Sequence, residues 1–319
     1  MQVTSQAQPN IALVKYWGKR DADRNLPATG SLSVTLDTLW TRMTVEFDGG
    51  DGDRLYVNGQ SAPSLLSRVS RCLDTVAGRG RSGACIESEC NFPIAAGLAS
   101  SASSFAALVQ AASRASGQSL DPLALARLAG QASGSAARSL YGGFVELRAG
   151  DDEIDVASIA APDEWPLSVT VAVTERAAKP VSSGAAMSVS RESSPFYNTW
   201  VERQPADLDK AREAVRTRDF AALAAIAEHN CLKMHSVMWT SRPPIVYWNS
   251  ATVACLETVR ALQRDGIPVF FTIDAGPQVK AVSSPESADA VADALRGTAG
   301  VIDVLQSSLG TGARLVDPD

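Results

Sequence analysis

One stretch constrains the fold more than any other: residues 92–105 (FPIAAGLASSASSF), which combine a proline, a glycine and paired serines. Before it, residues 84–91 alternate between apolar or small and polar side chains, which predicts a strand. After it, residues 102–115 are alanine-rich with apolar residues at helical spacing. A strand, a glycine-containing loop and a helix start bring free N–H groups and the positive end of a helix dipole together, which favours a phosphate site. The alternative is a small-residue turn that caps a buried helix, because the segment matches neither a Walker loop nor G-x-G-x-x-G.

The bulk composition limits the possible function classes. The 319 residues, 45% apolar and 20% charged, predict roughly two globular domains. A net charge of −6 argues against a nucleic-acid partner, which would need a basic stripe. No apolar run is long enough to cross a bilayer and the first residues lack a signal-peptide pattern, so we expect no membrane partner and a cytoplasmic protein.

The cysteines and histidines narrow the chemistry. Five cysteines without a C-x-x-C spacing predict reduced, mostly buried thiols. His229 and His235 are six residues apart on an expected helix and so on different faces, which argues against a zinc pair. With only two histidines a Ser-His-Asp hydrolase is also disfavoured. Acid–base chemistry is therefore expected from carboxylates or lysines.

The first unit is expected to begin with strands and to continue with helices. An apolar strand at residues 12–14 leads to Lys15, Tyr16, Trp17, Gly18, Lys19 and Arg20, which is either an anion site or a solvated charge cluster anchored by Trp17. Strands are expected at residues 31–36 and 41–47, with 48–52 as a hairpin loop before another strand at 55–57. Residues 65–76 predict an amphipathic helix that carries Arg68 and Arg71.

A second serine-rich stretch, residues 133–143, is a further candidate anion site. Asp121 and Pro122 predict the start of a helix that ends near Gly130, and Ser133 or Ser135 is expected to cap the next one. Ser135 and Arg138 would then share a face that suits a carboxylate or phosphate; the alternative is an arginine paired with a surface acid. A polar stretch at residues 150–165 predicts the boundary between domains 1–165 and 166–319.

The second unit is expected to be an antiparallel sheet with helices on one face. A strand at residues 167–173, a polar loop at 179–184 and helices at 207–216, 219–229 and 249–264 come first, the last with Val253 on its apolar side. Residues 268–273 predict a central strand that ends in Asp274, a carboxylate that is costly there unless it is paired or used. The alternative is that Asp274 caps the turn. A strand at 279–282, a helix at 285–295 and strands at 301–305 and 313–316 complete the unit.

Four ordered segments resemble the diphosphomevalonate decarboxylase family of the galactokinase–homoserine kinase–mevalonate kinase–phosphomevalonate kinase (GHMP) superfamily. They are residues 9–21 (PNIALVKYWGKRD), 93–101 (PIAAGLASS), 133–138 (SGSAAR) and 271–277 (FTIDAGP). The resemblance covers nearly the whole chain. It implies an α+β two-domain fold, with an N-terminal domain like domain 2 of ribosomal protein S5 and a ferredoxin-like C-terminal domain. It also implies a homodimer that converts mevalonate 5-diphosphate and ATP, with Mg²⁺, into isopentenyl diphosphate, CO2, ADP and phosphate in isoprenoid biosynthesis.

The same resemblance implies site residues. Ala96, Gly97, Leu98, Ala99, Ser100 and Ser101 would surround the ATP phosphates, with Ser101 towards Mg²⁺. Asp274 would be the catalytic aspartate, Lys15 a lysine beside the reacting phosphate, and Arg138 the carboxylate-binding arginine. The substrate contacts would come from four segments of the chain: Tyr16, Trp17, Gly18 and Lys19; Arg68; Ser133, Gly134, Ser135, Ala136 and Ala137; and Ser183 and Gly184.

Three positions depart from the family pattern. Ala132 and Ala137 stand where the family usually has glycine and cysteine, and Gly184 stands where it often has a polar residue. The last change bears on the distal phosphate and leaves two alternatives with the same fold, a mevalonate 5-phosphate decarboxylase and a mevalonate 3-kinase. An alternative of a different class is a non-catalytic RNA-binding or assembly protein, which the acidic charge opposes.

Overall fold

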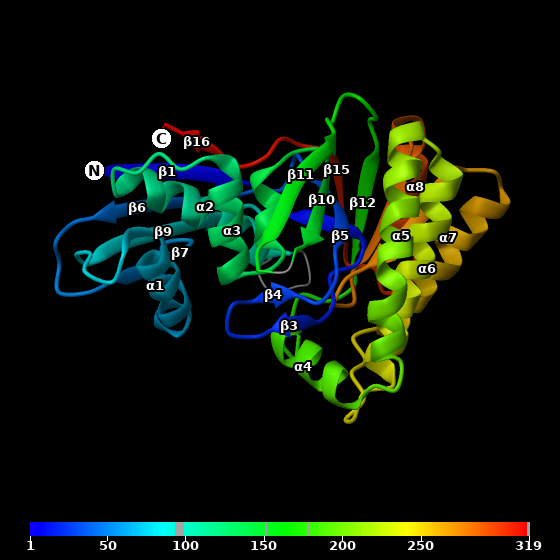
Figure 1. The fold of residues 1–319 in the computed structure, drawn as a ribbon. Helices are drawn as coiled ribbons and strands as arrows, with labels where there is room; N and C mark the ends of the chain where they lie inside the picture. Colours follow the sequence, from blue (N-terminus) through cyan, green and yellow to red (C-terminus); the bar gives the residue numbers. More distant parts are fainter. Residues whose placement is uncertain (93–98, 151, 178, 318–319) are drawn as a thin grey trace.

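The computed structural model describes residues 1–92, 99–150, 152–177 and 179–317, and its first unit is built on two sheets and a set of helices (Figure 1). The larger sheet has six strands in the order β16-β1-β6-β9-β7-β8, and the smaller has four in the order β11-β10-β5-β2. The strands of this unit are β1 Gln2–Ala7, β2 Asn10–Val14, β5 Ser31–Thr35, β6 Thr41–Phe47, β7 Arg54–Val57, β8 Gln60–Ser61, β9 Ala84–Cys90, β10 Phe144–Ala149 and β11 Ile154–Ala160, with a separate ribbon of β3 Lys19–Asp21 and β4 Leu26–Pro27.

The helices of the first unit share one apolar core with both sheets. They are α1 Pro63–Ala77, α2 Ser100–Ala115, α3 Pro122–Ala132 and the short 3-10 helix η1 Ala136–Leu140. The core joins Val45 and Ile86 of the larger sheet, the alanine-rich face of α2, and Val145 and Val156 of the smaller sheet. The small side chains of α2 let it lie close to β1 and β6, so the helix that follows the candidate phosphate loop is held in the centre of the unit.

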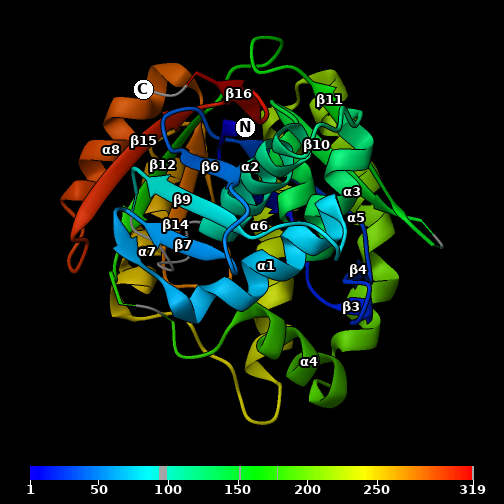
Figure 2. The same ribbon diagram turned by 90° about the vertical axis from the view of Figure 1, so that its left-hand side faces the viewer.

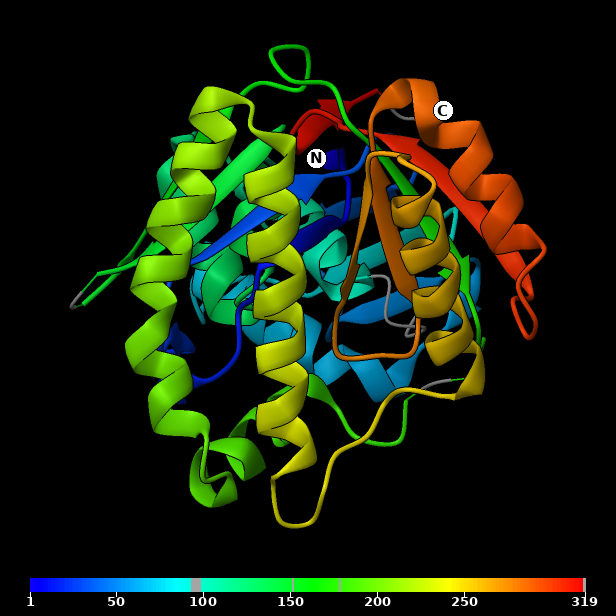
Figure 3. The ribbon, with the colours of Figure 1, turned by 90° about the vertical axis from the view of Figure 1, so that its right-hand side faces the viewer.

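The second unit is a four-stranded antiparallel sheet, in the order β13-β14-β12-β15, with helices packed on it. Its elements are β12 Ser168–Val173, α4 Ser183–Ser193, α5 Tyr197–Thr217, α6 Phe220–Trp239, α7 Ser250–Arg264, β13 Val269–Ile273, β14 Val279–Ser283, η2 Pro285–Ser287, α8 Ala288–Arg296 and β15 Asp303–Ser308. Seen from the side opposite the first unit, α5 to α8 form the outer layer of the molecule (Figure 3). The chain order β12, helices, β13, β14, α8, β15 is the β-α-β-β-α-β arrangement of a ferredoxin-like domain. The expected α+β two-domain fold is confirmed.

The two units pack on each other through a continuous apolar core. Ile11 of β2 and Val34 of β5 belong to the same buried cluster as Val169 of β12 and Leu208 of α5. Side-chain hydrogen bonds follow the same junction, since Thr272 of β13 donates to the carbonyl of Ala12 at 3.2 Å. The end of β2 and the end of β13 therefore meet where the two units join.

Three sequence-based predictions about strands are wrong. Residues 48–52 do not form a hairpin loop, because β9 lies between β6 and β7 and pairs with both (Figure 2). The predicted central strand, β13, is an edge strand whose side chains are buried by the helices that pack on it. The segment at 313–316 was expected in the second unit, but β16 (Arg314–Val316) returns to the first and pairs with β1.

Further differences lie in the helices and at the expected boundary. The polar stretch at 150–165 contains β11, which pairs with β10, so it is partly a hairpin. The expected polar loop at 179–184 leads into α4, which begins at Ser183. Helices α5 and α6 are much longer than predicted, and Val253 of α7 is 46% exposed instead of facing the core. Among the described helices none is long and apolar enough to cross a membrane.

Candidate active site

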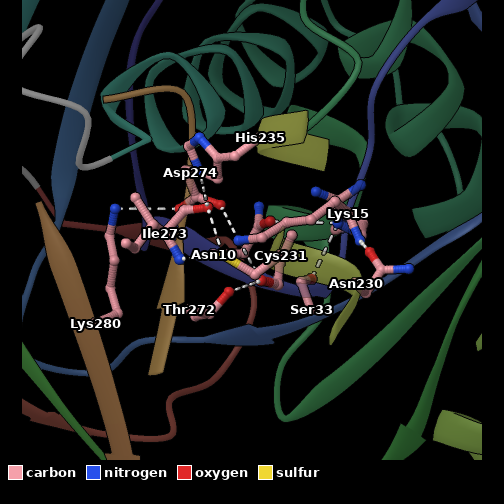
Figure 4. Close-up of polar contacts among 12 residues, drawn as sticks. Asn10, Lys15, Ser33, Asn230, Cys231, His235, Thr272, Ile273, Asp274 and Lys280 are labelled. Atoms are coloured by element: carbon pink, nitrogen blue, oxygen red, sulfur yellow. Dashed lines mark hydrogen bonds and ion pairs between the residues drawn. The ribbon is translucent and has the colours of Figure 1, made fainter. Parts of the chain in front are cut away.

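Asp274 lies between two buried lysines at the end of β13. Its Oδ1 is 2.6 Å from Nζ of Lys15, and its Oδ2 is 3.2 Å from Nζ of Lys280 on β14. The lysine side chains are 1% and 0% exposed, whereas that of Asp274 is 23% exposed. Figure 4 shows the two ammonium groups approaching the carboxylate from different sides. Burial alone would raise the pKa of Asp274, but the two lysines outweigh it and hold the pKa below its ordinary value.

The main chain just before Asp274 is fixed by helix α6. The N–H of Ile273 donates to Sγ of Cys231 at 3.2 Å, and its carbonyl lies 3.2 Å from Nε2 of His235 (Figure 4). Burial lowers the pKa of His235 to about 3, so the ring is neutral at neutral pH. The turn after Asp274 is closed by the backbone, because the Gly276 N–H donates to the Asp274 carbonyl at 2.8 Å. The carboxylate therefore does not cap the turn, and it forms ion pairs with the two lysines instead.

Lys15 is held at its backbone as well as at its ammonium group. Its N–H donates to Oδ1 of Asn230 on α6, and its carbonyl accepts from Nε2 of Gln204 on α5, both at 2.8 Å. Its Nζ also donates to the carbonyl of Ala12 at 2.8 Å. A lysine with both backbone groups and its side chain bonded in the interior is not part of a solvated charge cluster, so that alternative is wrong for Lys15.

Arg138 is buried on η1 in a cradle of neutral oxygens. Its Nη1 donates to Oγ of Ser31 at 2.7 Å, and its Nε donates to Oγ of Ser33 at 3.0 Å and to Oδ1 of Asn10 at 3.3 Å. Among the described residues no carboxylate lies within ion-pair distance of it, so it is not an arginine paired with a surface acid. Burial lowers its pKa to about 10, and the group is still charged at neutral pH. A buried guanidinium without an acid partner is well suited to bind an anion.

The local structure around Arg138 differs from the prediction. Neither Ser133 nor Ser135 caps an α-helix through its side chain: Ser133 follows the last residue of α3, and Ser135 precedes the short η1 without a side-chain cap bond. Ser135 instead accepts at its carbonyl from Nδ2 of Asn10 at 3.0 Å. Ala136 and Ala137 are fully buried in the core of the first unit, so their side chains pack against the protein.

Lys179 is a further lysine beside Asp274. Its Nζ donates to Oγ of Ser183 at 2.6 Å and to the carbonyl of Ala275 at 2.9 Å. Burial lowers its pKa to about 8, with Asp274 acting against that change and Lys280 adding to it. Gly184, the next residue of α4, has no atom of another described residue, its two chain neighbours and the backbone of its own helix apart, within 4 Å of where a side chain would begin.

The Tyr16–Lys19 segment divides between core and site. The Trp17 ring is 1% exposed and packs with Trp200, whose Nε1 donates to the Trp17 carbonyl at 2.9 Å, so the ring is a core anchor. The Tyr16 hydroxyl is buried without a hydrogen-bond partner among the described residues, and a Cβ on Gly134 would lie 2.3 Å from it. Burial raises the pKa of Tyr16 to about 12, so the hydroxyl keeps its proton. Gly18 has φ +104°, and a Cβ there would lie 2.1 Å from the Tyr197 hydroxyl.

Two further cations lie near each other at the edge of the site. Burial lowers the pKa of Lys19, and the charge of Arg68 on α1 lowers it further. Arg68 lies over the Phe105 ring at 4.4 Å and donates from Nη2 to the carbonyl of Ala132 at 2.9 Å. The guanidinium is thereby held beside the end of α3, close to the serine-rich stretch at 133–138.

The start of α2 carries the candidate phosphate-binding serines. Ala96, Gly97 and Leu98 lie outside the described residues; Ala99 has φ 56°, and Ser100 and Ser101 open the helix. The residue before the helix, Ala99, has no side-chain oxygen to cap this N-terminus. Ser101 Oγ accepts from Ser133 Oγ at 3.4 Å, which links the α2 start to the stretch that carries Arg138. Mg²⁺ bound to a nucleotide needs one or two protein oxygens, and the Ser101 hydroxyl fits that need.

Comparison with known proteins assigns the family. Residues 7–160 match the family model described as diphosphomevalonate decarboxylase-like N-terminal domain, and residues 169–308 match mevalonate 5-diphosphate decarboxylase C-terminal domain. Diphosphomevalonate decarboxylase ERG19 of Gibberella zeae is 35% identical over 94% of this chain and 86% of its own length. The chain belongs to the diphosphomevalonate decarboxylase family.

Solved structures of diphosphomevalonate decarboxylases share the whole fold. The crystal structure of mevalonate diphosphate decarboxylase from Staphylococcus aureus has a TM-score of 0.93 at 34% identity and covers 99% of this chain and 98% of that one. A protein called MDDEF, solved in complex with MVAPP, AMPPCP and magnesium, has a TM-score of 0.92 at 34% identity and covers 100% and 99%.

The sequence named Lys15, Arg138 and Asp274 as site residues, and the structure brings Lys15 and Asp274 into contact. It did not name two further groups, the lysines Lys179 and Lys280 and the side chains around Arg138. Lys280 had a signal, since a lysine inside an apolar strand is costly unless it is paired. Lys179 lies in a segment that the sequence predicts only as a polar loop, so the sequence does not assign it to the site. The cradle of Arg138, formed by Asn10, Ser31 and Ser33, had no signal because it joins three separate segments.

Proposed function

We propose that this protein catalyses the ATP-dependent decarboxylation of mevalonate 5-diphosphate to isopentenyl diphosphate, CO2, ADP and phosphate. The observation that supports it most directly is the charge arrangement around Asp274. Lys15, Lys280, Lys179 and Arg138 all act electrostatically on this one carboxylate, so the site has an excess of positive charge. An excess of buried cations suits a substrate with a carboxylate and a phosphate tail that meets ATP.

The reaction needs the 3-hydroxyl of the substrate to become a leaving group. Its oxygen attacks the γ-phosphorus of ATP, the bond to the β-phosphate oxygen breaks, and ADP leaves. The C3–O bond then breaks with release of phosphate, while the C1–C2 electron pair forms the new double bond and C1 leaves as CO2. Such a transfer depends mainly on positioning and charge neutralisation, and bound Mg²⁺ would neutralise charge on the ATP phosphates.

We assign roles by what each group can reach. The Asp274 side chain is 23% exposed, and its carboxylate accepts the hydrogen bond and then the proton of the 3-hydroxyl. Arg138 binds the substrate carboxylate, since its fork is oriented and has no acid partner among the described residues. Lys15 and Lys179 stabilise the transferring phosphoryl group, and the Tyr16 hydroxyl donates to the substrate. Lys19 and Arg68 bind the phosphate tail, and the α2 start with Ser100 and Ser101 binds ATP.

Measuring CO2, ADP and phosphate from mevalonate, its 5-phosphate and its 5-diphosphate tests this proposal. We expect equal amounts of the three products and the highest kcat/KM with the 5-diphosphate. Faster turnover of the 5-phosphate would favour a monophosphate decarboxylase, which the open space at Gly184 would suit. ADP without CO2 would indicate a 3-kinase, and tight RNA binding without ATP turnover would contradict an enzyme altogether. The homodimer is a prediction that sedimentation tests, and the cytoplasmic location is one that cell fractionation tests.

A further inference from the structure

Lys280 lies behind Asp274, on the side that a substrate does not reach. Its side chain is fully buried, and Oδ2 of Asp274, the atom that it approaches, is buried as well, although the Asp274 side chain as a whole is 23% exposed. Lys15 is equally buried, but it contacts the other oxygen, Oδ1. Because Oδ2 is buried, a ligand that reaches the carboxylate meets Oδ1, on the side of Lys15, and does not touch Lys280. Any effect of Lys280 on the reaction must pass through Asp274, which separates it from a lysine that binds phosphate directly.

The strand register explains why Lys280 faces Asp274. In the β13–β14 pair, Thr272 is opposite Lys280 and Ile273 is opposite Val279. Because side chains alternate along a strand, Thr272 and Asp274 point to the same face, where Lys280 lies diagonally across from Asp274. The short connection between the two strands thus places a lysine at Oδ2, while Lys15, the residue after β2 of the first unit, lies at Oδ1.

We propose that Lys280 is a positioning residue for the decarboxylation: it fixes Oδ2 of Asp274 from the sealed side and keeps the carboxylate charged when the substrate hydroxyl arrives. The inference rests on the proposed function. With only Lys15 present, the carboxylate would have one fixed oxygen and could rotate away from the hydroxyl. The lysine at the second oxygen holds the plane of the carboxylate, with its exposed part towards the substrate.

The groups around Asp274 determine what removal of Lys280 does. Those that act on it from the packed elements are Lys15, Lys280, Lys179, Arg138, His235 and Cys231. His235 and Cys231 are both neutral, because burial lowers the pKa of His235 to about 3 and raises the pKa of Cys231. Loss of one cation while burial persists raises the pKa of Asp274, so the carboxylate protonates at higher pH.

A direct test is the titration of the Asp274 carboxyl carbon by NMR in protein labelled with ¹³C at the aspartate carboxyl, with the signal assigned by its loss in Asp274→Asn. In the wild type the signal should stay in its ionised position through the ordinary aspartate range near 3.8. In Lys280→Met the midpoint should rise by about 1–3 pH units. Lys280→Arg keeps the charge, so its midpoint should lie close to that of the wild type. An unchanged midpoint in Lys280→Met, or a wild-type carboxyl that titrates in the ordinary range, would overturn the proposal.

The pH profile of turnover gives a second readout. The acid limb of kcat/KM should move to higher pH in Lys280→Met, with kcat reduced about 10- to 100-fold and the KM for ATP unchanged. Arg81→Met is the matched control: it removes the cation of another buried ion pair, with Asp53 at 2.6 Å, on the first unit. It should lower stability and leave the acid limb where it is. Lys280→Gln serves in place of the methionine variant if that variant does not fold.

The two readouts separate this inference from the proposed function. If the wild type releases no CO2 from any mevalonate derivative, the proposed function fails, while the NMR titration still decides whether Lys280 controls the charge of Asp274. If the wild type is active and Lys280→Met has the wild-type acid limb, Lys280 is only structural and the inference fails alone.

Discussion

At the scale of single residues, Arg138 is a buried charged group that has no acid partner among the described residues. Arg138 is 2% exposed, and within the described part of the chain its hydrogen bonds go to neutral oxygens of Ser31, Ser33 and Asn10. Burying a charge in this way costs stability unless a ligand supplies the opposite charge. The cradle fixes Nε and Nη1, so the guanidinium has one orientation in which to meet a carboxylate.

Arg138→Lys should therefore fail although it keeps the charge. An ammonium cannot span the three oxygens of the cradle or bind two carboxylate oxygens at once, so kcat/KM for the diphosphate should fall about 100-fold. The affinity for ATP should be unchanged. Steady-state kinetics together with calorimetric titration of ATP measure both quantities. Arg81→Lys, at a paired arginine on the first unit, is the control that should keep wild-type kinetics; near-wild-type turnover of Arg138→Lys would contradict the assigned role.

At the scale of elements, helix α6 holds the main chain at Lys15 and next to Asp274. Along one helix, Asn230 holds the N–H of Lys15, while Cys231 and His235 hold Ile273, the residue before Asp274. Asn230 also donates from Nδ2 to Asp207 at 2.7 Å and to Gln204, which in turn binds the Lys15 carbonyl. Lys15 of the first unit is thus held by helices of the second unit.

Asn230→Ala should lower both stability and turnover. It leaves the buried N–H of Lys15 without its acceptor, which should cost about 2 kcal/mol of the free energy of unfolding, and it frees Lys15 to move from Asp274. Denaturant unfolding and kcat measure the two effects. The control is Asp219→Ala on the same helix, which removes the cap on the Ala222 N–H and should cost about 1 kcal/mol without changing kcat. Equal kcat for both variants would contradict the inference that Asn230 holds Lys15 in place for turnover.

The sequence predicted features within one element, such as a helix cap or the buried face of a strand, better than it predicted which strands pair in a sheet. Asp121 caps α3 as expected, and β9 buries Ala84, Ile86 and Ser88 on one face, because these features depend on adjacent residues. The place of β9 between β6 and β7, and of β13 at a sheet edge, depends on pairing between distant segments. In the site, the motifs predicted Lys15, Arg138 and Asp274, whereas Lys280 and the Arg138 cradle needed the register and the junction of the units.

At the scale of the whole molecule, the site exists only where the two units meet. Lys15 and Arg138 come from the first unit, and Asp274, Lys179 and Lys280 come from the second. A charged contact crosses the same junction: Glu146 of β10, 1% exposed, is bound by Arg212 of α5 at 2.6 Å and by Arg148 at 3.1 Å. Burial would raise the pKa of Glu146, but the arginines outweigh it and hold the pKa below its ordinary value.

The Glu146–Arg212 contact predicts a pH-dependent coupling of the units. A carboxyl whose pKa is lowered on folding stabilises the fold above its ordinary pKa, near 4.5, and that contribution is lost as the pH falls through the lowered value. Arg212→Met should cost about 1 kcal/mol at pH 7, a small effect because the guanidinium is partly exposed. The difference from wild type should shrink below pH 4.5. Thermal unfolding across pH measures this difference in stability. The control is Arg216→Met, which removes the cation of an exposed ion pair on the same helix and should show neither effect. A difference between Arg212→Met and wild type that stays constant with pH would contradict the coupling.

The most direct test of the account is single-turnover CO2 release by Asp274→Asn with saturating ATP and mevalonate 5-diphosphate. The amide keeps the shape of the side chain but cannot take the proton of the 3-hydroxyl, so the rate should fall by about 10³-fold or more while both ligands bind as tightly as to the wild type. CO2 release within tenfold of the wild type would contradict the central role of Asp274, and with it the reaction centre described for this molecule.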